Sequence, residues 1–389
     1  MSIMLATEKD HDEIIKVMAT CFNWNVENML KERKDIPINN HEQFFVYKNE
    51  NNEIESLLSV VSFDAFYEGS VVKYGGIAGV STLPQYRKKG NIRKIMENAI
   101  EYMYQNNMII SGLGPFKFEF YRQFGYEWCY DFQIVNCKID YLKDFKLADN
   151  YKSFSYKSAY IVERFRNKVI CDINGAIYRD DHFIKQQWNK YKSKKSKVIG
   201  AYYNHKLVSY MVINSEKDTI KVDEMYYQDE KSRQYLLAYL SKYIGKYEKV
   251  EFLIQTQDNL RTILPSPRIT TYRWPNMMGR IIDVKKALEL YKVNKSFKKS
   301  INMKVVDLMN PHNNKTFKLS CINNKLSVLE TKEKDDFSID INRLSQLLFG
   351  FLSAKELIEI DEINISNKSI IPVIESLFTK RKTMIWQEF

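Results

Sequence analysis

The sequence predicts a multi-domain α+β protein, and three observations support this prediction. The chain has 389 residues, which is more than one hydrophobic core usually organises. Apolar strand-like runs and amphipathic helical stretches follow one another up to about residue 145, and the same pattern then starts again. A third strand-rich stretch begins near residue 300 and ends in a helix. We therefore expect three domains, at residues 1–145, 146–290 and 291–389.

The composition is ordinary for a soluble globular protein, with 44% hydrophobic and 28% charged residues. No apolar run approaches the length of a membrane span, and the N-terminus lacks the pattern of a signal peptide. The five cysteines are odd in number and lack C-x-x-C spacing, and the five histidines are scattered. We therefore expect a cytoplasmic protein with free thiols and no metal site.

The net charge of +11 raises the question of nucleic-acid binding. The basic residues are spread along the chain and are accompanied by 48 acidic ones, and no nucleic-acid-binding motif is present. A solvated basic surface is therefore the favoured interpretation, and we expect only weak, non-specific binding to DNA.

The first domain is expected to consist of a helix, three antiparallel strands, a second helix and a further strand. Residues 13–22 carry an apolar stripe at helical spacing, and Asn23 to Asn25 break the pattern. Residues 44–47, 54–63 and 71–80 are typical of strands separated by polar or glycine-containing turns. The second helix follows as far as Asn106, and residues 108–113 are another apolar strand.

A basic loop lies between the third of these strands and the second helix. The loop reads Arg87-Lys88-Lys89-Gly90, and the helix after it repeats apolar residues from Ile92 at helical spacing. Unpaired backbone N–H groups and the helix dipole both favour an anion at such a helix start. The pattern therefore indicates a phosphate site. The alternative is an ordinary solvated basic turn.

An aromatic segment at residues 115–127 follows the strand at 108–113. Phe116, Phe120 and Tyr121 have helical spacing and are compatible with a packed core. Tyr126, however, comes directly after Gly125, so its phenol follows a turn. A phenol placed directly after a glycine turn is a candidate functional group. The alternative is that Tyr126 is a structural core residue.

The second domain repeats the order of the first but changes the loop chemistry. Strands are expected at 198–203, 207–213 and 220–227, followed by a helix at 232–244. Where the first domain has its basic loop, this one reads Tyr227-Gln228-Asp229-Glu230-Lys231-Ser232. Acidic residues there oppose anion binding, so this domain is expected to be structural.

The third domain is predicted to have strands at 302–308, 315–322 and 325–331, followed by a helix at 339–350. Leu344, Leu347 and Leu348 form an apolar stripe on that helix. A packed core is the favoured interpretation of the stripe, and the lining of a cavity is the alternative.

The basic loop resembles the pyrophosphate loop of the GNAT N-acetyltransferases, written Q/R-x-x-G-x-G/A. Residues 87–91 fit this pattern, whereas Ile92 stands where glycine or alanine is expected. The Eis-like (enhanced intracellular survival) branch often carries a bulky residue there. The aromatic segment at 115–127, the strand at 277–284 and the aromatic C-terminus also resemble that branch. The resemblance implies tandem GNAT folds with mixed, mostly antiparallel sheets, the first catalytic and the second degenerate, and then a sterol-carrier-like α+β domain.

For the co-substrate, the resemblance implies acetyl-CoA bound at the end of the third strand and at the basic loop. The backbone of Val80 and Thr82 would pair with the pantetheine arm, and basic side chains would neutralise the phosphates. The implied binding residues are Val80, Ser81, Thr82, Arg87, Lys88, Lys89, Gly90, Asn91, Ile92 and Arg93.

For catalysis, the resemblance implies that Tyr126 is the general acid and that the α-carboxylate of Phe389 is the general base. Phe22 and Trp24 would line the acceptor pocket, with ordinary core packing as their alternative. Glu27 and Glu388 would face a polycationic acceptor, either an aminoglycoside-like amine or a lysine side chain. The Eis-like family also implies a hexamer.

A binding protein is the second functional hypothesis. In this hypothesis the sterol-carrier-like domain holds a lipid or another small ligand, and the GNAT units serve as a scaffold. The intact basic loop and the Phe-Gly-Tyr turn favour the enzyme, because a scaffold needs neither. A rise in melting temperature with acetyl-CoA would distinguish the two hypotheses.

Overall fold

The structure is a computed structural model that describes residues 2–33, 41–148, 151–155, 159–293, 297, 299–323 and 325–385. The chain divides into two compact units, each treated separately below. Unit 1 comprises Met1–Tyr130, Met277–Arg381 and Ile385–Phe389, and unit 2 comprises Asp131–Asn276 and Lys382–Met384. Unit 1 therefore joins the N-terminal third of the chain to most of its C-terminal quarter.

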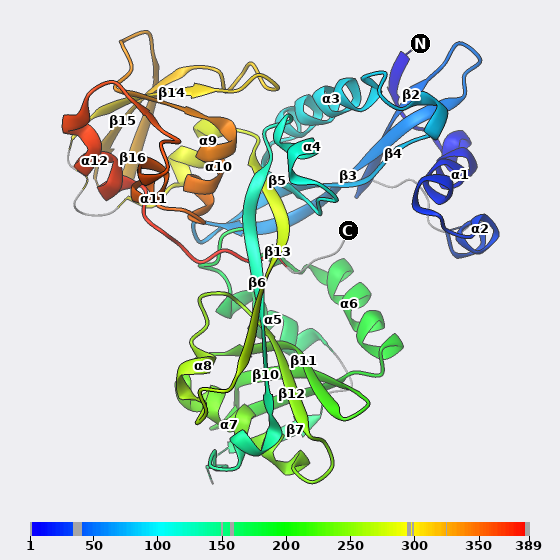
Figure 1. Ribbon diagram of the computed structural model, residues 1–389, viewed down its shortest axis with the longest axis vertical. Helices are drawn as coiled ribbons and strands as arrows, with labels where there is room; N and C mark the ends of the chain where they lie inside the picture. The colour runs from blue at the N-terminus through cyan, green and yellow to red at the C-terminus, as the bar shows by residue number, and fades with distance from the viewer. Residues whose placement is uncertain are drawn as a thin grey trace. The chain divides into compact units, whose positions relative to one another are not determined.

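The N-terminal part of unit 1 is a mixed sheet with helices on both faces (Figure 1). The strand order is β1-β2-β3-β4-β5-β13, and every pair is antiparallel except the parallel pair β4/β5. The strands are β1 (Ser2–Leu5), β2 (Glu42–Lys48), β3 (Ile54–Tyr67), β4 (Ser70–Thr82), β5 (Met108–Leu113) and β13 (Thr270–Ile281). The helices are α1 (His11–Phe22), α2 (Val26–Arg33), α3 (Asn91–Gln105) and α4 (Phe118–Arg122), with 3-10 turns at Glu8–Asp10 and Pro84–Tyr86.

The alternation of side chains along β2 explains why both faces of this sheet are covered. Phe44 and Val46 pack in one cluster with the apolar stripe of α1. Phe45 and Tyr47 point the opposite way and pack in a second cluster with α3 and α4. The sheet is thus the middle layer, and α3 and α4 share a face.

The C-terminal part of unit 1 has its own sheet, in the order β16-β15-β14-β17-β18 (Figure 1). The strands are β14 (Ile301–Val306), β15 (Thr316–Ile322), β16 (Lys325–Thr331), β17 (Phe337–Asp340) and β18 (Asn364–Ile365). The helices are α9 (Val284–Leu290), α10 (Ile341–Phe349), α11 (Ala354–Glu359) and α12 (Ile371–Leu377), with a 3-10 turn at Lys368–Ile370. The helix expected from residue 339 begins two positions later, because Ile339 pairs with Val305 in the parallel ladder β14/β17.

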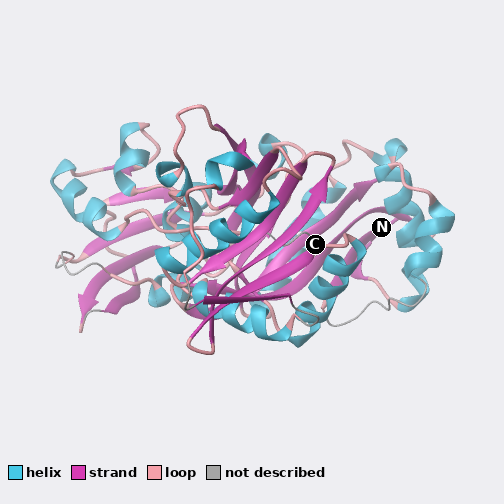
Figure 2. Cartoon of the chain, turned by 90° about the horizontal axis from the view of Figure 1, so that it is seen from below, coloured by secondary structure: helices cyan, strands magenta, loops and turns pink. Residues whose placement is uncertain are grey.

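Unit 2 repeats the strand pattern of the N-terminal sheet, in the order β6-β12-β11-β10-β9-β7, with β11/β12 as its parallel pair. The strands are β6 (Glu127–Lys138), β7 (Tyr151–Ser155), β8 (Ile177–Tyr178), β9 (Lys197–Tyr203), β10 (Lys206–Glu216), β11 (Thr219–Tyr227) and β12 (Lys249–Ile254). The helices are α5 (Tyr160–Val169), α6 (Asp181–Ser193), α7 (Glu230–Leu240) and α8 (Leu260–Ile263), with 3-10 turns at Ile139–Leu142 and Ser241–Tyr243. Figure 2 shows the strands in magenta with the cyan helices along them.

The two sheets exchange strands along the chain. The strand next to β5 in unit 1 is β13, which comes from beyond residue 269, whereas β6, which follows the first repeat, pairs with β12 in unit 2. Each sheet is therefore completed by a strand from the other repeat. The tandem α+β architecture predicted from the sequence is confirmed, and the exchange is a feature that the sequence pattern did not reveal.

Candidate functional site

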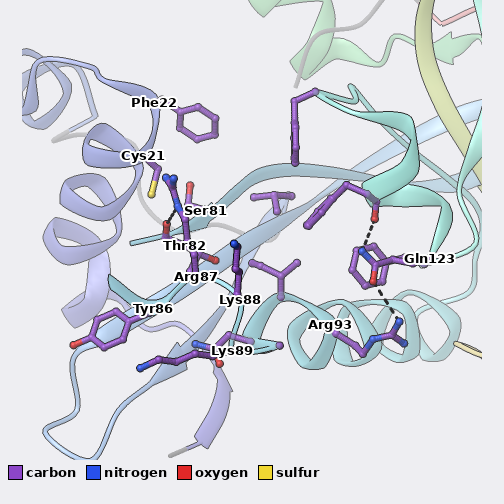
Figure 3. Close-up of a pocket in the computed structure, with 17 residues that line it drawn as sticks. Cys21, Phe22, Ser81, Thr82, Tyr86, Arg87, Lys88, Lys89, Arg93 and Gln123 are labelled. Carbon is purple, nitrogen blue, oxygen red and sulfur yellow. Dashed lines mark hydrogen bonds between the residues drawn. The ribbon is translucent and has the colours of Figure 1, made fainter. Parts of the chain in front are cut away.

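Unit 1 contains a cavity of about 680 Å³ at the start of α3. Its walls come from the end of α1, the end of β4, the basic loop, the first turn of α3 and the segment around α4 (Figure 3). All ten residues expected to bind the co-substrate line this cavity: Val80, Ser81, Thr82, Arg87, Lys88, Lys89, Gly90, Asn91, Ile92 and Arg93. The ten residues implied by the resemblance therefore lie around one cavity.

The end of β4 is shaped by a β-bulge. Leu57 of β3 pairs with Ser81, but Ser59 pairs with Ala78, so β4 contains one extra residue at this point. Gly79 lies in the bulge with a φ of +61°, a conformation that favours glycine. The parallel pairing with β5 has already ended at Ile77. Backbone groups of β4 beyond Ile77 are thus available on the side that faced β5.

The start of α3 has the features of an anion site. Gly90 is the N-cap with a φ of +79°, no side chain caps the helix, and its first turn contains no acidic residue. The first N–H groups of an α-helix have no intrahelical partner, so they remain available to a ligand. Asn91 is buried and donates from its Nδ2 to Glu55 Oε2 at 2.9 Å, which fixes this end of the helix to β3.

Four cationic residues line the cavity around this helix start: Arg87, Lys88, Lys89 and Arg93. None of the described residues that line the cavity is acidic. Arg87 donates from its Nε to the Thr82 carbonyl at 3.3 Å, and Lys89 lies 4.9 Å from the centre of the Tyr86 ring. Arg93 donates to Gln123 Oε1 at 3.3 Å (Figure 3). Cations beside open N–H groups fit the phosphates of a CoA molecule.

Aromatic side chains form the other wall. Phe22 lines the cavity and is stacked on Trp24 with ring centres 4.7 Å apart, and both rings are exposed. Phe116 is 72% exposed and lines the cavity as well. Trp24 does not itself line the cavity, and neither does Glu27, which lies exposed on α2. Glu388 and Phe389 lie outside the described residues.

Tyr126 is fully buried and does not line the cavity. Its hydroxyl lies 2.7 Å from Ser111 Oγ, and Ser111 in turn donates to the Gly75 carbonyl at 2.6 Å. A carbonyl only accepts, so the single hydrogen of Ser111 is used there, and the Tyr126 hydroxyl must donate to Ser111. Burial raises the pKa of Tyr126 to about 12.

A second phenol, Tyr121, lies on α4. Its ring packs edge-on against Phe116 with centres 5.4 Å apart, and its hydroxyl makes none of the hydrogen bonds seen among the described residues. Burial raises the pKa of Tyr121 well above its usual value. The helical spacing of Tyr121 is compatible with a packed core, but spacing does not reveal where a hydroxyl lies.

The corresponding helix start in unit 2 is closed by its own side chain. Asp229 caps α7, accepting from the backbone N–H of Ser232 at 2.8 Å as part of a capping box. A carboxylate occupies the position that an anion would need. This geometry leaves less room for an anion at the start of α7, and the absence of CoA binding by the second domain stays a prediction.

The apolar stripe of α10 is part of a packed core. Leu344, Leu347 and Leu348 are fully buried, and so is Phe349, whose ring lies 5.2 Å from that of Tyr130 and 6.3 Å from that of Tyr67. The favoured interpretation of this stripe therefore agrees with the structure.

Three protein-family models match the chain. An acetyltransferase (GNAT) domain matches residues 2–129, a second acetyltransferase (GNAT) domain matches residues 175–281, and a sterol carrier protein domain matches residues 284–386. The chain is a GNAT-family N-acetyltransferase. No curated protein sequence matches it.

Solved structures from several bacteria share the fold of the chain over nearly its whole length. A probable N-acyltransferase from Enterococcus faecalis has a TM-score of 0.84 at 19% identity, with 99% of each chain covered. A GCN5-related N-acetyltransferase from Anabaena variabilis has a TM-score of 0.86 at 18% identity, with 98% of each chain covered. Eis1 from Mycobacterium abscessus has a TM-score of 0.81 at 15% identity, with 100% of each chain covered. The fold predicted by the Eis-like resemblance is therefore confirmed.

Three further findings concern the described residues alone. None of the five cysteines forms a disulfide bond. Among these residues there is no group of histidine, cysteine and acidic side chains that could hold a metal ion. None of the helices has the length and apolar character needed to span a membrane.

Proposed function

We propose that this GNAT-family enzyme transfers an acetyl group from acetyl-CoA to an amine of a cationic acceptor, with acetyl-CoA bound in the cavity of unit 1. The observation that carries the proposal is the uncapped start of α3, surrounded by Arg87, Lys88, Lys89 and Arg93. Acetyl-CoA would supply the acetyl group as a thioester, and the chain would hold its phosphates at the helix start and its pantetheine arm along the end of β4.

In the reaction, the amine nitrogen forms a bond to the acetyl carbon, and the bond from that carbon to sulfur breaks. One proton leaves the amine, and one proton reaches the departing thiolate. Positioning of the amine against the thioester supplies much of the rate enhancement in such a transfer. Two phenols are candidates for delivering the proton to sulfur.

Tyr126 is the acid implied by the Eis-like resemblance. To act, it must give up its hydrogen bond to Ser111, after which the Ser111 hydroxyl could turn from Gly75 and donate to the phenolate. Tyr121 has no such bond to break and lies against an aromatic wall of the cavity. Tyr121 is therefore the second candidate. Replacing each tyrosine by phenylalanine and measuring kcat distinguishes them.

The acceptor side rests on the resemblance. The cavity described here is basic, so a cationic acceptor needs carboxylates beyond its lining. Glu27, Glu388 and the Phe389 carboxylate are the proposed partners, and Phe389 is the proposed base. Deleting residues 388–389 tests the roles of Glu388 and Phe389. Loss of turnover with acetyl-CoA binding retained supports them, and unchanged turnover removes Glu388 and Phe389 from the mechanism.

Aminoglycosides and lysine side chains are the proposed acceptor classes, and a hexamer is the proposed assembly, to be tested by light scattering. We place the enzyme in the cytoplasm, because five cysteines without a disulfide bond suit a reducing compartment. Lipid binding by the sterol-carrier-like part is the alternative function. It predicts that a fluorescent fatty acid binds the protein and that acetyl-CoA does not.

A further inference from the structure

We propose that Asn342 is a positioning residue for acetyl transfer, because it holds the turn between α4 and β6 in place from the sterol-carrier-like part of unit 1. The inference rests on the proposed function. It assigns a catalytic purpose to a domain whose family model, by itself, points to lipid binding.

The contact is made by one side-chain amide. Asn342, at the start of α10, donates from its Nδ2 to the carbonyls of Arg122 and Tyr126, at 3.0 Å each. An amide nitrogen carries two hydrogens, so both are used. Arg122 is the last residue of α4, and its carbonyl also accepts from the backbone N–H of Gly125 at 3.0 Å, so the Asn342 amide is its second donor. Asn342 thus caps α4 from a segment more than 200 residues further along the chain.

Arg280 supports the same turn from the other side of Gly125. Its Nη1 donates to the Phe124 carbonyl at 2.7 Å, and its Nη2 binds both carboxylate oxygens of Asp307 at 2.8 and 2.7 Å. Gly125 has a φ of +81°, and a Cβ there would lie 1.5 Å from Arg280 Nη1. The carbonyls of Arg122, Phe124 and Tyr126 are therefore all held by side chains from beyond residue 276.

This turn carries part of the cavity. Gln123 and Phe124 line the cavity, and Gln123 accepts a hydrogen bond from Arg93 in the first turn of α3. The turn also leads into Tyr126. Helix α4 has only five residues, too few to be stable by itself, so its orientation depends on outside contacts. Displacement of this turn would move the aromatic wall and both candidate acids relative to the thioester.

Gln346 offers a matched comparison on the same helix. It lies one turn after Asn342 and donates from its Nε2 to the Trp128 carbonyl at 2.8 Å, beyond the turn. Both amides thus join α10 to backbone carbonyls between the end of α4 and the start of β6, and the Gln346 Oε1 also accepts from Arg343 Nη1 at 3.0 Å. Of these two amides, only that of Asn342 is bonded to the turn that lines the cavity.

The test compares Asn342→Leu with Gln346→Met, which remove the amide donors at similar volume. We expect Asn342→Leu to lower kcat about tenfold or more, because misplacement of catalytic groups by about 1 Å is costly, while the KM for acetyl-CoA changes less than threefold. Both variants should lower Tm by similar amounts, because each removes one amide donor. Gln346→Met should keep kcat within about twofold of the wild-type value. Equal kcat values in the two variants would overturn the proposal.

A second measurement does not depend on turnover. With 3-fluorotyrosine placed at position 126, the fluorine NMR signal should shift or split in Asn342→Leu and stay unchanged in Gln346→Met. An unchanged signal in both variants would overturn the positioning role. If the wild type binds no acetyl-CoA and releases no CoA, the proposed function fails, whereas the fluorine spectra still decide whether Asn342 orders this turn.

Discussion

The hydroxyl of Tyr126 donates to Ser111 Oγ across 2.7 Å, and neither residue lines the cavity. Ser111 cannot return a hydrogen without breaking its own bond to the Gly75 carbonyl. Gly75 of β4, Ser111 of β5 and Tyr126, the residue before β6, therefore form a buried chain of hydrogen bonds. This chain holds the phenolic proton of Tyr126. Whether this proton or that of Tyr121 reaches the leaving sulfur is open to a direct test.

The first prediction concerns the acid. If Tyr126 delivers the proton, Tyr126→Phe should lower kcat by about 10²–10⁴-fold, the usual contribution of a general acid, and Tyr121→Phe should have a much smaller effect. If Tyr121 delivers it, the order reverses. Rates at saturating acetyl-CoA measure both variants. Equal, small losses would exclude both phenols as the acid.

The second prediction concerns pH. Burial raises the pKa of Tyr126 from about 10 to about 12, so the folded protein keeps this phenol neutral where the unfolded chain begins to lose its proton. The resulting stabilisation is fully present below pH 10 and is lost as the pH rises through about 12. Tyr226 and Tyr291 are raised to about 12 as well, so the measurement is a difference between variants.

The comparison for that prediction is wild type against Tyr126→Phe in urea unfolding between pH 9 and 11. The wild type should lose more free energy of unfolding over this interval, with a limit of about 1.4 kcal/mol per pH unit for one proton. A constant difference between the two proteins across the interval would show that the phenol titrates normally.

The third prediction concerns the basic loop. Lys88 and Lys195 both lie on turns with positive φ, at 64° and 53°, but only Lys88 lines the cavity. Lys88→Glu should weaken acetyl-CoA binding about tenfold or more, because reversing a charge beside the phosphates removes one attraction and adds one repulsion. The loss should shrink at high salt. Lys195→Glu should leave the affinity unchanged in the same calorimetric titration.

The fourth prediction concerns stability. Arg280 and Asp307 are both fully buried and form a bidentate pair, so Asp307→Asn leaves a buried guanidinium without its counter-charge. We expect a loss of about 3–5 kcal/mol in the free energy of unfolding. The exposed pair of Lys318 and Glu333, at 3.0 Å, is the control, and Glu333→Gln should cost at most about 1 kcal/mol. Similar losses in both variants would contradict the assignment.

The basic end of the cavity could be predicted from the sequence because most of its lining residues are close together in the chain. Residues 87–93 span a loop and a helix start, where charge, glycine and helical period can be read directly. The polar contacts that hold the opposite wall are not local. Arg93 and Gln123 are 30 residues apart, and Asn342 lies more than 200 residues from Arg122, so no periodicity reveals these contacts.

The fold was predictable for a similar reason. Strand and helix periods repeat in both GNAT-like halves, and the domain order followed from the resemblance. The long strand β6 was not predicted from the sequence, because its buried and exposed residues do not alternate regularly. Strand β12 was not predicted either. The exchange of β6 and β13 depends on pairing between distant segments, which a single sequence does not specify.

The most direct test of the central claim is release of CoA from acetyl-CoA, measured by thiol detection with a panel of aminoglycosides and a lysine-containing peptide. We expect turnover with at least one amine in the wild type, and a raised KM for acetyl-CoA in Lys88→Glu. The absence of turnover, together with no rise in Tm on adding acetyl-CoA, would contradict the claim that this cavity serves acetyl transfer.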